Sequence, residues 1–200
     1  MKIRARPRSQ RVMMEIGARE SAPPMVLDEL RLKKILVPVD FSDCSDKALR
    51  YAISFARQFQ AELFLLHVVE TFYPPPELIM AESAAVEQKS LAEAEKELSR
   101  WKRRTGKIPG QSVVCRGSPQ REIVSLAEEN NIDLIVLGTH GRSGMAHLLL
   151  GSTAERVARH APCPVLIVRT VEHDFIQETA AQKRAWARME NRGRSPRHPD

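Results

Sequence analysis

The feature that most constrains the fold of this chain is an alternation of short apolar runs with amphipathic segments. Five mostly apolar runs bounded by polar residues are typical of strands buried on both faces. They cover residues 34–40, 61–69, 112–116, 133–138 and 164–169. Between them, apolar residues recur every three or four positions, as on one face of a helix. This spacing predicts helices after the first run as far as Phe59, over 84–104, from Pro119, and over 152–160.

Strands that alternate with helices form a parallel sheet covered by helices on both sides. We therefore expect a single α/β domain over residues 33–170, with a five-stranded parallel sheet flanked by helices in a Rossmann-like arrangement. In such sheets, ligands bind at the carboxyl ends of the strands, where the strand order reverses. The first strand is the expected centre, so Asp40 to Asp43, which follow it, are expected to line a crevice.

The positive charge of the chain is concentrated outside this domain. The net charge is +6, and residues 1–33 alone hold eight basic and four acidic residues. We interpret residues 1–32 as a flexible, disordered extension; the alternative is a tail that adheres to an acidic partner. Residues 171–200 are expected to form a second extension, partly helical and then disordered. The nearly neutral domain argues against specific binding to nucleic acid, which normally requires a basic face on the folded part.

Composition also argues against several classes of protein. No run of about 18 apolar residues is present to cross a membrane, and the basic start of the chain lacks the apolar stretch of a secretory signal. The three cysteines, Cys44, Cys115 and Cys163, are far apart, which argues against a disulfide framework and against a structural zinc site. Reduced thiols are typical of a cytoplasmic protein, and no metal site built from side chains is predicted.

A glycine-rich segment carries the strongest functional signal. After the fourth strand, the sequence GTHGRSGMAHLLLGST places Gly138 and Gly141 three residues apart and Gly151-Ser152 at the start of the last helix. Glycines allow positive φ angles and close approach of the backbone to a ligand. Ser152 is a suitable N-cap. The amides of such a loop and of a helix N-terminus stabilise a phosphate without any lysine.

With this loop in place, the sequence resembles the universal stress protein family, in its nucleotide-binding branch. The resemblance covers residues 33–169 and rests on KKILVPVDFS, LLHVVE, the glycine loop with its full spacing, and HAPCPVLIVR. It implies a fold related to the adenine nucleotide α-hydrolases, with ATP bound at the strand ends and Mg²⁺ held through the phosphates. It also implies a homodimer formed along the last strand, Pro164 to Arg169.

The resemblance also implies which positions contact the nucleotide. Around the nucleoside these are Pro38, Val39, Asp40 near the ribose or adenine, and Val68 against the adenine. Around the ribose and phosphates they are Gly138, His140, Gly141, Gly151, Ser152 and Thr153, with the basic residue Arg142 inside the loop. Taken alone, Asp40 is more simply explained as a cap of the next helix, and His67 as a hydrogen-bonded core histidine.

Other nucleotide-binding classes lack their motifs here, because there is no GxxxxGK[ST], no GxGxxG after the first strand and no protein-kinase set. Our first hypothesis is an ATP-binding stress-response or signalling switch whose occupancy changes its affinity for a protein partner. The second is a slow ATPase or self-phosphorylating enzyme. Its polar candidates beside the phosphates are Asp40, His140 and Ser152, and no catalytic residue is assigned. The third is an interaction module that works through its tails and ignores nucleotide.

Overall fold

The computed structural model describes residues 2–5, 12–15, 30–70, 82–139, 151–170 and 176, with side chains for 30–70, 88–139, 151–170 and 176. The chain divides into two units, residues 1–30 and 31–200, which are described separately.

In the first unit, β1 (Lys2–Ala5) and β2 (Val12–Glu15) pair as antiparallel strands. Both strands lie within residues 1–32, the segment interpreted above as a flexible extension. The register sets Lys2 opposite Glu15 and Ile3 opposite Met14. Four-residue strands are too short to give a periodicity that stands out in the sequence.

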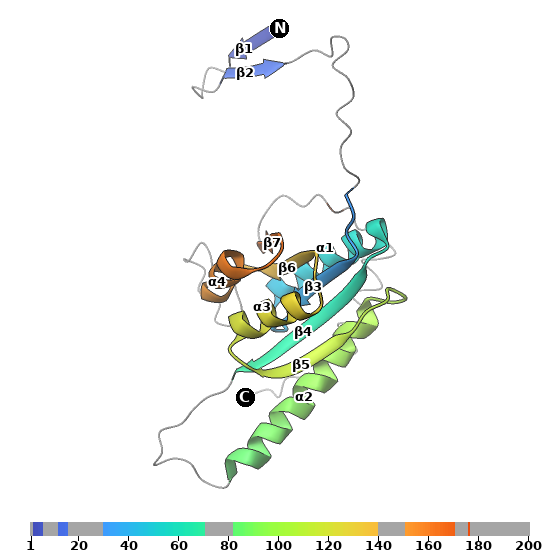
Figure 1. Ribbon diagram of the computed structural model, residues 1–200, viewed down its shortest axis with the longest axis vertical. Helices are drawn as coiled ribbons and strands as arrows, with labels where there is room; N and C mark the ends of the chain where they lie inside the picture. The colour runs from blue at the N-terminus through green and yellow to red at the C-terminus, as the bar shows by residue number, and fades with distance from the viewer. Residues whose placement is uncertain are drawn as a thin grey trace, which may run out of the picture. The chain divides into compact units, whose positions relative to one another are not determined.

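The second unit is built on a five-stranded sheet (Figure 1). Its strands are β3 (Lys34–Pro38), β4 (Glu62–Glu70), β5 (Ser112–Gly117), β6 (Leu134–Gly138) and β7 (Val165–Val168). Their order is β5-β4-β3-β6-β7, and every neighbouring pair is parallel. The predicted α/β class, the five parallel strands and the central place of the first predicted strand are therefore confirmed.

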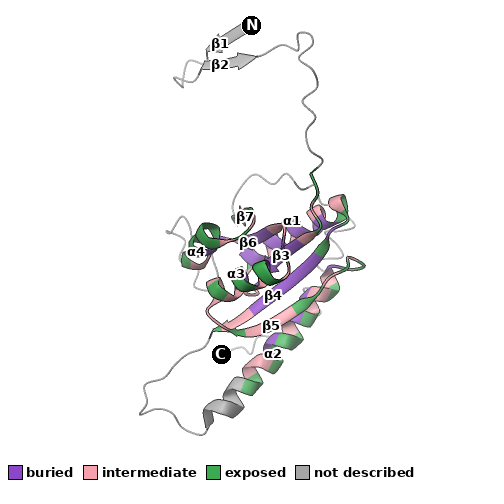
Figure 2. Ribbon diagram, viewed as in Figure 1, coloured by how far each residue is buried: buried purple, intermediate pink, exposed green. Residues whose placement is uncertain are grey.

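Four helices cover the two faces of this sheet: α1 (Asp43–Phe59), α2 (Glu82–Arg104), α3 (Pro119–Glu129) and α4 (Ser152–His160). One core packs α1 and α2 on a face that includes Val37, Leu65 and Val136. The other core packs α3 and α4 on the opposite face, which includes Leu36 and Leu66. Figure 2 shows the resulting burial, with β3 and β4 largely buried between the two helical layers.

The order of connections creates a switch point beside β3. After β3 the chain adds β4 and then β5 on one side, and it returns to add β6 and then β7 on the other. The connections that follow β3 and β6 therefore diverge, which leaves room for a ligand at their carboxyl ends. None of the helices within the described residues is both long and apolar enough to cross a membrane. The predicted C-terminal helix lies outside the described residues, apart from Ile176, which packs against the core beneath α1 and α2.

Candidate functional site

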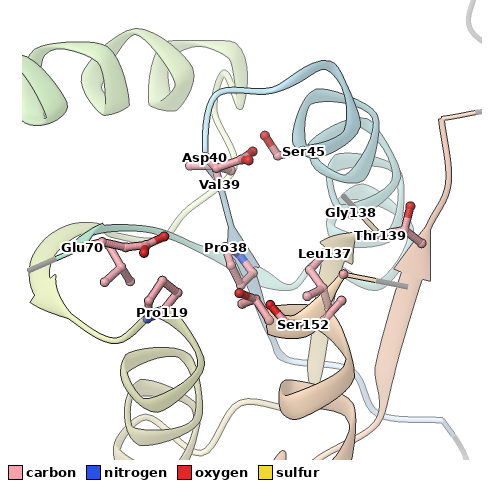
Figure 3. A pocket seen from close by; sticks show the side chains of 14 residues that line it. Pro38, Val39, Asp40, Ser45, Glu70, Pro119, Leu137, Gly138, Thr139 and Ser152 are labelled. Carbon is pink, nitrogen blue, oxygen red and sulfur yellow. The ribbon is translucent and has the colours of Figure 1, made fainter. Parts of the chain in front are cut away.

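A cavity opens at the carboxyl ends of the central strands, at the predicted switch point (Figure 3). Its volume of about 430 Å³ lies in the range of about 300–1,000 Å³ that is usual for small-molecule sites. The strand ends and helix starts around it contribute Pro38, Val39, Asp40, Ser45, Val68, Glu70, Pro119, Leu137, Gly138, Thr139, Gly151, Ser152, Thr153 and Ala154. In Figure 3, Asp40 and Ser45 lie on one side of the space and Ser152 lies across from them.

Eight of the residues predicted to contact a nucleotide line this one cavity: Pro38, Val39, Asp40, Val68, Gly138, Gly151, Ser152 and Thr153. They come from four separate parts of the sequence, and the fold brings them together. The other three, His140, Gly141 and Arg142, lie outside the described residues. Contact of all eleven with a nucleotide stays a prediction.

Six lining residues were not predicted: Ser45, Glu70, Pro119, Leu137, Thr139 and Ala154. Each lies at a strand end or in the first turn of a helix. The available signal was position, since every strand end at this edge of a parallel sheet faces the same crevice. Glu70 is the notable omission, because it ends β4 and adds a second carboxylate to the lining beside Asp40.

The carboxylate of Asp40 is held by a local turn after β3. Its Oδ1 accepts hydrogen bonds from the Ser42 amide at 3.1 Å and from the Ser42 hydroxyl at 2.6 Å. Its Oδ2 is buried and has no hydrogen-bond partner among the described residues. Leaving a buried charged oxygen without a donor costs free energy. This atom is therefore suited to accept a hydrogen bond from a hydroxyl of a ligand in the cavity.

Packing against aromatic rings supports the same turn. Phe41 has a φ of +66°, which is uncommon for a residue other than glycine. Its ring stacks on His67 at 4.3 Å between centroids and meets the edge of Trp101 at 5.6 Å. The Nδ1 of His67 lies 2.7 Å from the carbonyl oxygen of Val39. The prediction that His67 is a hydrogen-bonded core histidine is thereby confirmed.

The N-terminus of α4 is open toward the cavity. Gly151 is its N-cap residue, with extended φ and ψ of −68° and 150°, and no side chain caps the helix. The amides of Ser152, Thr153 and Ala154 begin the helix, where no preceding turn supplies acceptors. The prediction that Ser152 is the N-cap is wrong by one residue. The Gly151 amide donates to the Thr139 carbonyl at 2.8 Å, which holds Gly151 in extended backbone and makes Ser152 the first helical residue.

Gly138 has a different role from the one its place in the loop suggests. Positive φ is not what it supplies, because its φ lies outside the left-handed region. A Cβ at this position would lie 2.8 Å from the Sγ of Cys44 and 3.0 Å from its backbone carbon. Gly138 therefore lets the first turn of α1 pack directly on the end of β6, and it contributes to the cavity wall from there.

The described part of the cavity carries negative side chains and no basic ones. Asp40 and Glu70 are the charged residues in the described lining. An anionic group bound there must rely on amide N–H groups and on the positive end of the α4 dipole. No group of three or more metal-ligating side chains is present among the residues described.

The three cysteines are free thiols. Cys44 is buried near the cavity, and its Sγ donates to the Val168 carbonyl at 3.4 Å. Burial raises the pKa of the Cys115 thiol to about 11, and the charge and hydrogen bond of Glu122 add to this effect. Burial, ahead of the charge of Asp133, raises the pKa of Cys163 as well. Because reactivity requires the thiolate, Cys115 and Cys163 are not set up for redox chemistry at neutral pH.

The fold and the cavity define the class of protein: it is an α/β protein with a parallel sheet and a cavity at the carboxyl ends of its central strands. The chain belongs to the universal stress protein family, whose sequence profile matches residues 31–169.

Individual relatives agree with this assignment. Universal stress protein MJ0531 of Methanocaldococcus jannaschii is 38% identical over 144 residues, which cover 68% of this chain and 82% of the relative. YxiE of Bacillus subtilis is 35% identical over 147 residues, covering 68% and 98%. Among solved structures, the universal stress protein UspA from Lactobacillus plantarum has a TM-score of 0.63 at 32% identity, covering 70% and 99%. The protein MJ0577 of Methanocaldococcus jannaschii has a TM-score of 0.63 at 30% identity, covering 72% and 100%.

Proposed function

We propose that this protein binds ATP in the cavity at the strand ends, with Mg²⁺ held through the phosphates. We further propose that it acts as a homodimeric switch in a stress response or in signalling. One observation carries the proposal: the same cavity of about 430 Å³ is lined by a buried carboxylate oxygen and by a helix N-terminus, and among the described residues the first has no hydrogen-bond partner and the second no side-chain cap. The first group accepts from hydroxyls, and the second binds anions.

The residues fit the parts of a nucleotide. Asp40 Oδ2 is suited to a ribose hydroxyl, since a carboxylate only accepts hydrogen bonds. Val68 supplies apolar surface for the base. The first amides of α4, at Ser152 and Thr153, are suited to phosphate oxygens, with Arg142 as the predicted cation from the loop. A switch requires only that a partner bind the occupied and empty states with different affinity.

The homodimer is proposed along β7. This strand ends the sheet order, so one side of it has no neighbouring strand in the sheet. Such an edge is a liability unless it is covered. The carbonyl of Pro164 accepts from the Ile135 amide of β6, and the carbonyl of Val168 accepts from the amide of Thr139, which follows β6. Backbone groups alternate along a strand, so those of Ile167 point away from β6, the side on which a second copy is proposed. A cytoplasmic location is part of the proposal and is supported by the three free thiols.

Titration calorimetry with Mg-ATP tests the proposal. Wild type should bind, and Asp40→Asn should lower the affinity at least about tenfold, because hydrogen bonds to charged groups contribute roughly 1.5–3 kcal/mol. Asparagine keeps an oxygen for the Ser42 bonds and replaces the unpartnered oxygen by a donor that cannot accept from the ribose.

Glu70→Gln is the matched control, since this carboxylate also lines the cavity but is exposed. It should change affinity less than Asp40→Asn does. At a ligand concentration of 100 times Kd, wild type should also gain about 2.7 kcal/mol of stability against thermal unfolding. Absence of any binding heat or thermal shift at several millimolar Mg-ATP, with the protein folded, contradicts the ATP proposal. Turnover of ATP, measured alongside, separates a switch from a slow ATPase.

Sedimentation velocity tests the dimer. Ile167→Pro removes an amide that points away from the sheet and leaves the β6 pairing groups in place, as edge strands allow. Wild type should sediment as a dimer and the variant as a folded monomer. A variant that remains dimeric would place the interface elsewhere.

A further inference from the structure

We propose that His67 is a positioning residue of this site: it holds the turn that presents Asp40 to the nucleoside. The role of that turn in nucleotide binding rests on the function proposed above. The holding of the turn does not, and it can be measured without a ligand. Asp40 is flanked in the chain by Val39 and Phe41, and the His67 ring contacts both of these neighbours.

The first contact fixes the peptide unit that leads into Asp40. Nδ1 of His67 lies 2.7 Å from the carbonyl oxygen of Val39. A carbonyl oxygen only accepts, so the ring nitrogen must donate and therefore carries a proton. His67 is 9% exposed, so water competes little for this bond. Because the peptide is planar, fixing its carbonyl also fixes the direction of the Asp40 amide.

The second contact holds the residue that follows Asp40. Phe41 takes a left-handed φ of +66°, a conformation that surrounding structure must impose on a bulky side chain. The His67 ring stacks on Phe41 with centroids 4.3 Å apart and ring planes at 28°. The Trp101 ring also contacts Phe41, in an edge arrangement with the ring planes at 67°. Ser42, which binds Asp40 Oδ1, comes directly after Phe41. Releasing Phe41 would therefore move both the Asp40 backbone and the hydroxyl that orients its carboxylate.

The position of His67 in the sheet explains why it can do this. It lies on β4 beside the end of β3, where the amide of Val39 donates to the Leu66 carbonyl at 2.8 Å. The backbone ladder from β4 thus reaches Val39 through Leu66, and the side chain of the next residue binds the Val39 carbonyl. His67 thus connects the turn at Val39 to β4 through its side chain, beyond the last backbone hydrogen bond between the two strands.

Two variants separate the donor from the ring. His67→Phe keeps an aromatic ring against Phe41 and removes the donor. His67→Asn places an amide nitrogen two bonds beyond Cβ, as Nδ1 is, and removes the ring. ATP and inorganic tripolyphosphate are used as ligands in calorimetry, because only ATP has a nucleoside for Asp40 to contact. In the ligand-free protein, the Val39 carbonyl carbon shift reports the hydrogen bond and amide exchange at Ser42 reports the turn.

His67→Phe should shift the Val39 carbonyl signal, speed exchange at Ser42 and lower ATP affinity about tenfold, the loss expected for one hydrogen bond that orients a charged contact. Tripolyphosphate binding should stay as in wild type, and His67→Asn should restore most of the ATP affinity. A larger loss of ATP affinity in His67→Asn than in His67→Phe would overturn the proposal, because packing of the ring, and not its hydrogen bond, would then be the cause. So would an unchanged Val39 signal in His67→Phe.

A wild-type measurement covers the case in which His67→Phe does not fold. Nitrogen spectra of histidine-labelled protein must show the proton on Nδ1, and a ring protonated only at Nε2 overturns the proposal. If wild type binds no ATP, the function proposed above fails by itself. The Val39 and Ser42 signals then still decide whether His67 holds the turn.

Discussion

Two helices begin beside the same cavity, and their first turns are built differently. At the start of α1, the Ser42 side chain accepts from the Ser45 amide at 3.2 Å, and Ser42 in turn donates to Asp40. At the start of α4, the corresponding residue is Gly151, which has no side chain to offer. Both N-cap residues have extended backbone, so the difference lies in the side chains and not in the course of the chain.

The difference assigns the two helix starts separate tasks. At the start of α1, the Ser42 side chain accepts from the Ser45 amide and donates to the Asp40 carboxylate, so this helix start supports the carboxylate. The first turn of α4 leaves its amides available, which favours an anion from outside the chain. One helix start thus positions a side chain for the ligand, while the other offers its backbone to the ligand.

The largest effect is expected at Gly138, which ends β6 against the first turn of α1. A Cβ there would lie 2.8 Å from Cys44 Sγ and 3.0 Å from the backbone of α1, so Gly138→Ala must push the helix away from β6. We expect the free energy of unfolding to fall by about 1–3 kcal/mol, the usual cost of overpacking. Urea denaturation measures it.

A double-mutant cycle with Cys44→Ala is the control for this prediction. Removing Sγ takes away the closest contact but leaves the backbone carbon, so the cost of Gly138→Ala should be smaller, though still present, in that background. If Gly138→Ala leaves stability unchanged, the first turn of α1 does not depend on the absence of a side chain at this position.

The next effect follows from giving α4 the cap that α1 has. Gly151→Asp supplies a side-chain acceptor for the first amides and places a negative charge where phosphate is expected. We expect ATP affinity to fall about tenfold, or roughly 1.4 kcal/mol, while stability stays level or rises by a few tenths. Calorimetry at two salt concentrations measures it, since salt should reduce the loss.

Gly151→Asn is the matched control, because it caps without charge. It should lose less affinity than Gly151→Asp, and its loss should depend less on salt. Equal affinity in wild type and Gly151→Asp would mean that no phosphate lies at the α4 N-terminus.

The fold was predictable because its signals are local. The apolar runs located all five strands of the second unit, and the three-to-four spacing located all four helices. The first run was predicted to continue to Asp40, yet β3 ends at Pro38 because the chain turns away there. In that turn Phe41 packs against His67 and Trp101, which are distant in sequence. The turn therefore could not be predicted from the residues near Asp40. The short strands β1 and β2 were missed because four residues carry too little pattern.

The candidate site was predictable in location and less so in the task of each residue. The rule for strand ends and the glycine spacing both pointed to the carboxyl ends of the strands, where the cavity lies. The task of Gly138 was not predictable, since its neighbour Cys44 lies 94 positions earlier and is brought there by the packing of α1. The N-cap of α4 was displaced by one residue because the Thr139 carbonyl, outside the helix, binds the Gly151 amide.

A smaller effect is expected from removing the cap of α1. Ser42→Ala takes away the acceptor for the Ser45 amide and the hydroxyl that donates to Asp40 Oδ1. We expect a loss of about 1 kcal/mol in unfolding free energy, as for other N-cap serines. Ser42→Thr, which keeps the hydroxyl, should recover most of it. A loss in Ser42→Thr as large as in Ser42→Ala would show that the hydroxyl is not what stabilises this turn.

The smallest effect is expected at a third helix start, which extends the comparison. Ser118 is the N-cap residue of α3, but its side chain makes no cap hydrogen bond, and Pro119 follows it within the helix. Its carbonyl accepts from the Arg121 and Glu122 amides, and alanine keeps that carbonyl. Ser118→Ala should therefore change unfolding free energy by less than about 0.5 kcal/mol, as substitutions away from specific contacts do. Chemical denaturation beside Ser42→Ala measures the contrast. If Ser42→Ala and Ser118→Ala lower the free energy of unfolding equally, side-chain capping does not distinguish the helix starts around this cavity. The uncapped start of α4 would then no longer argue for a bound anion.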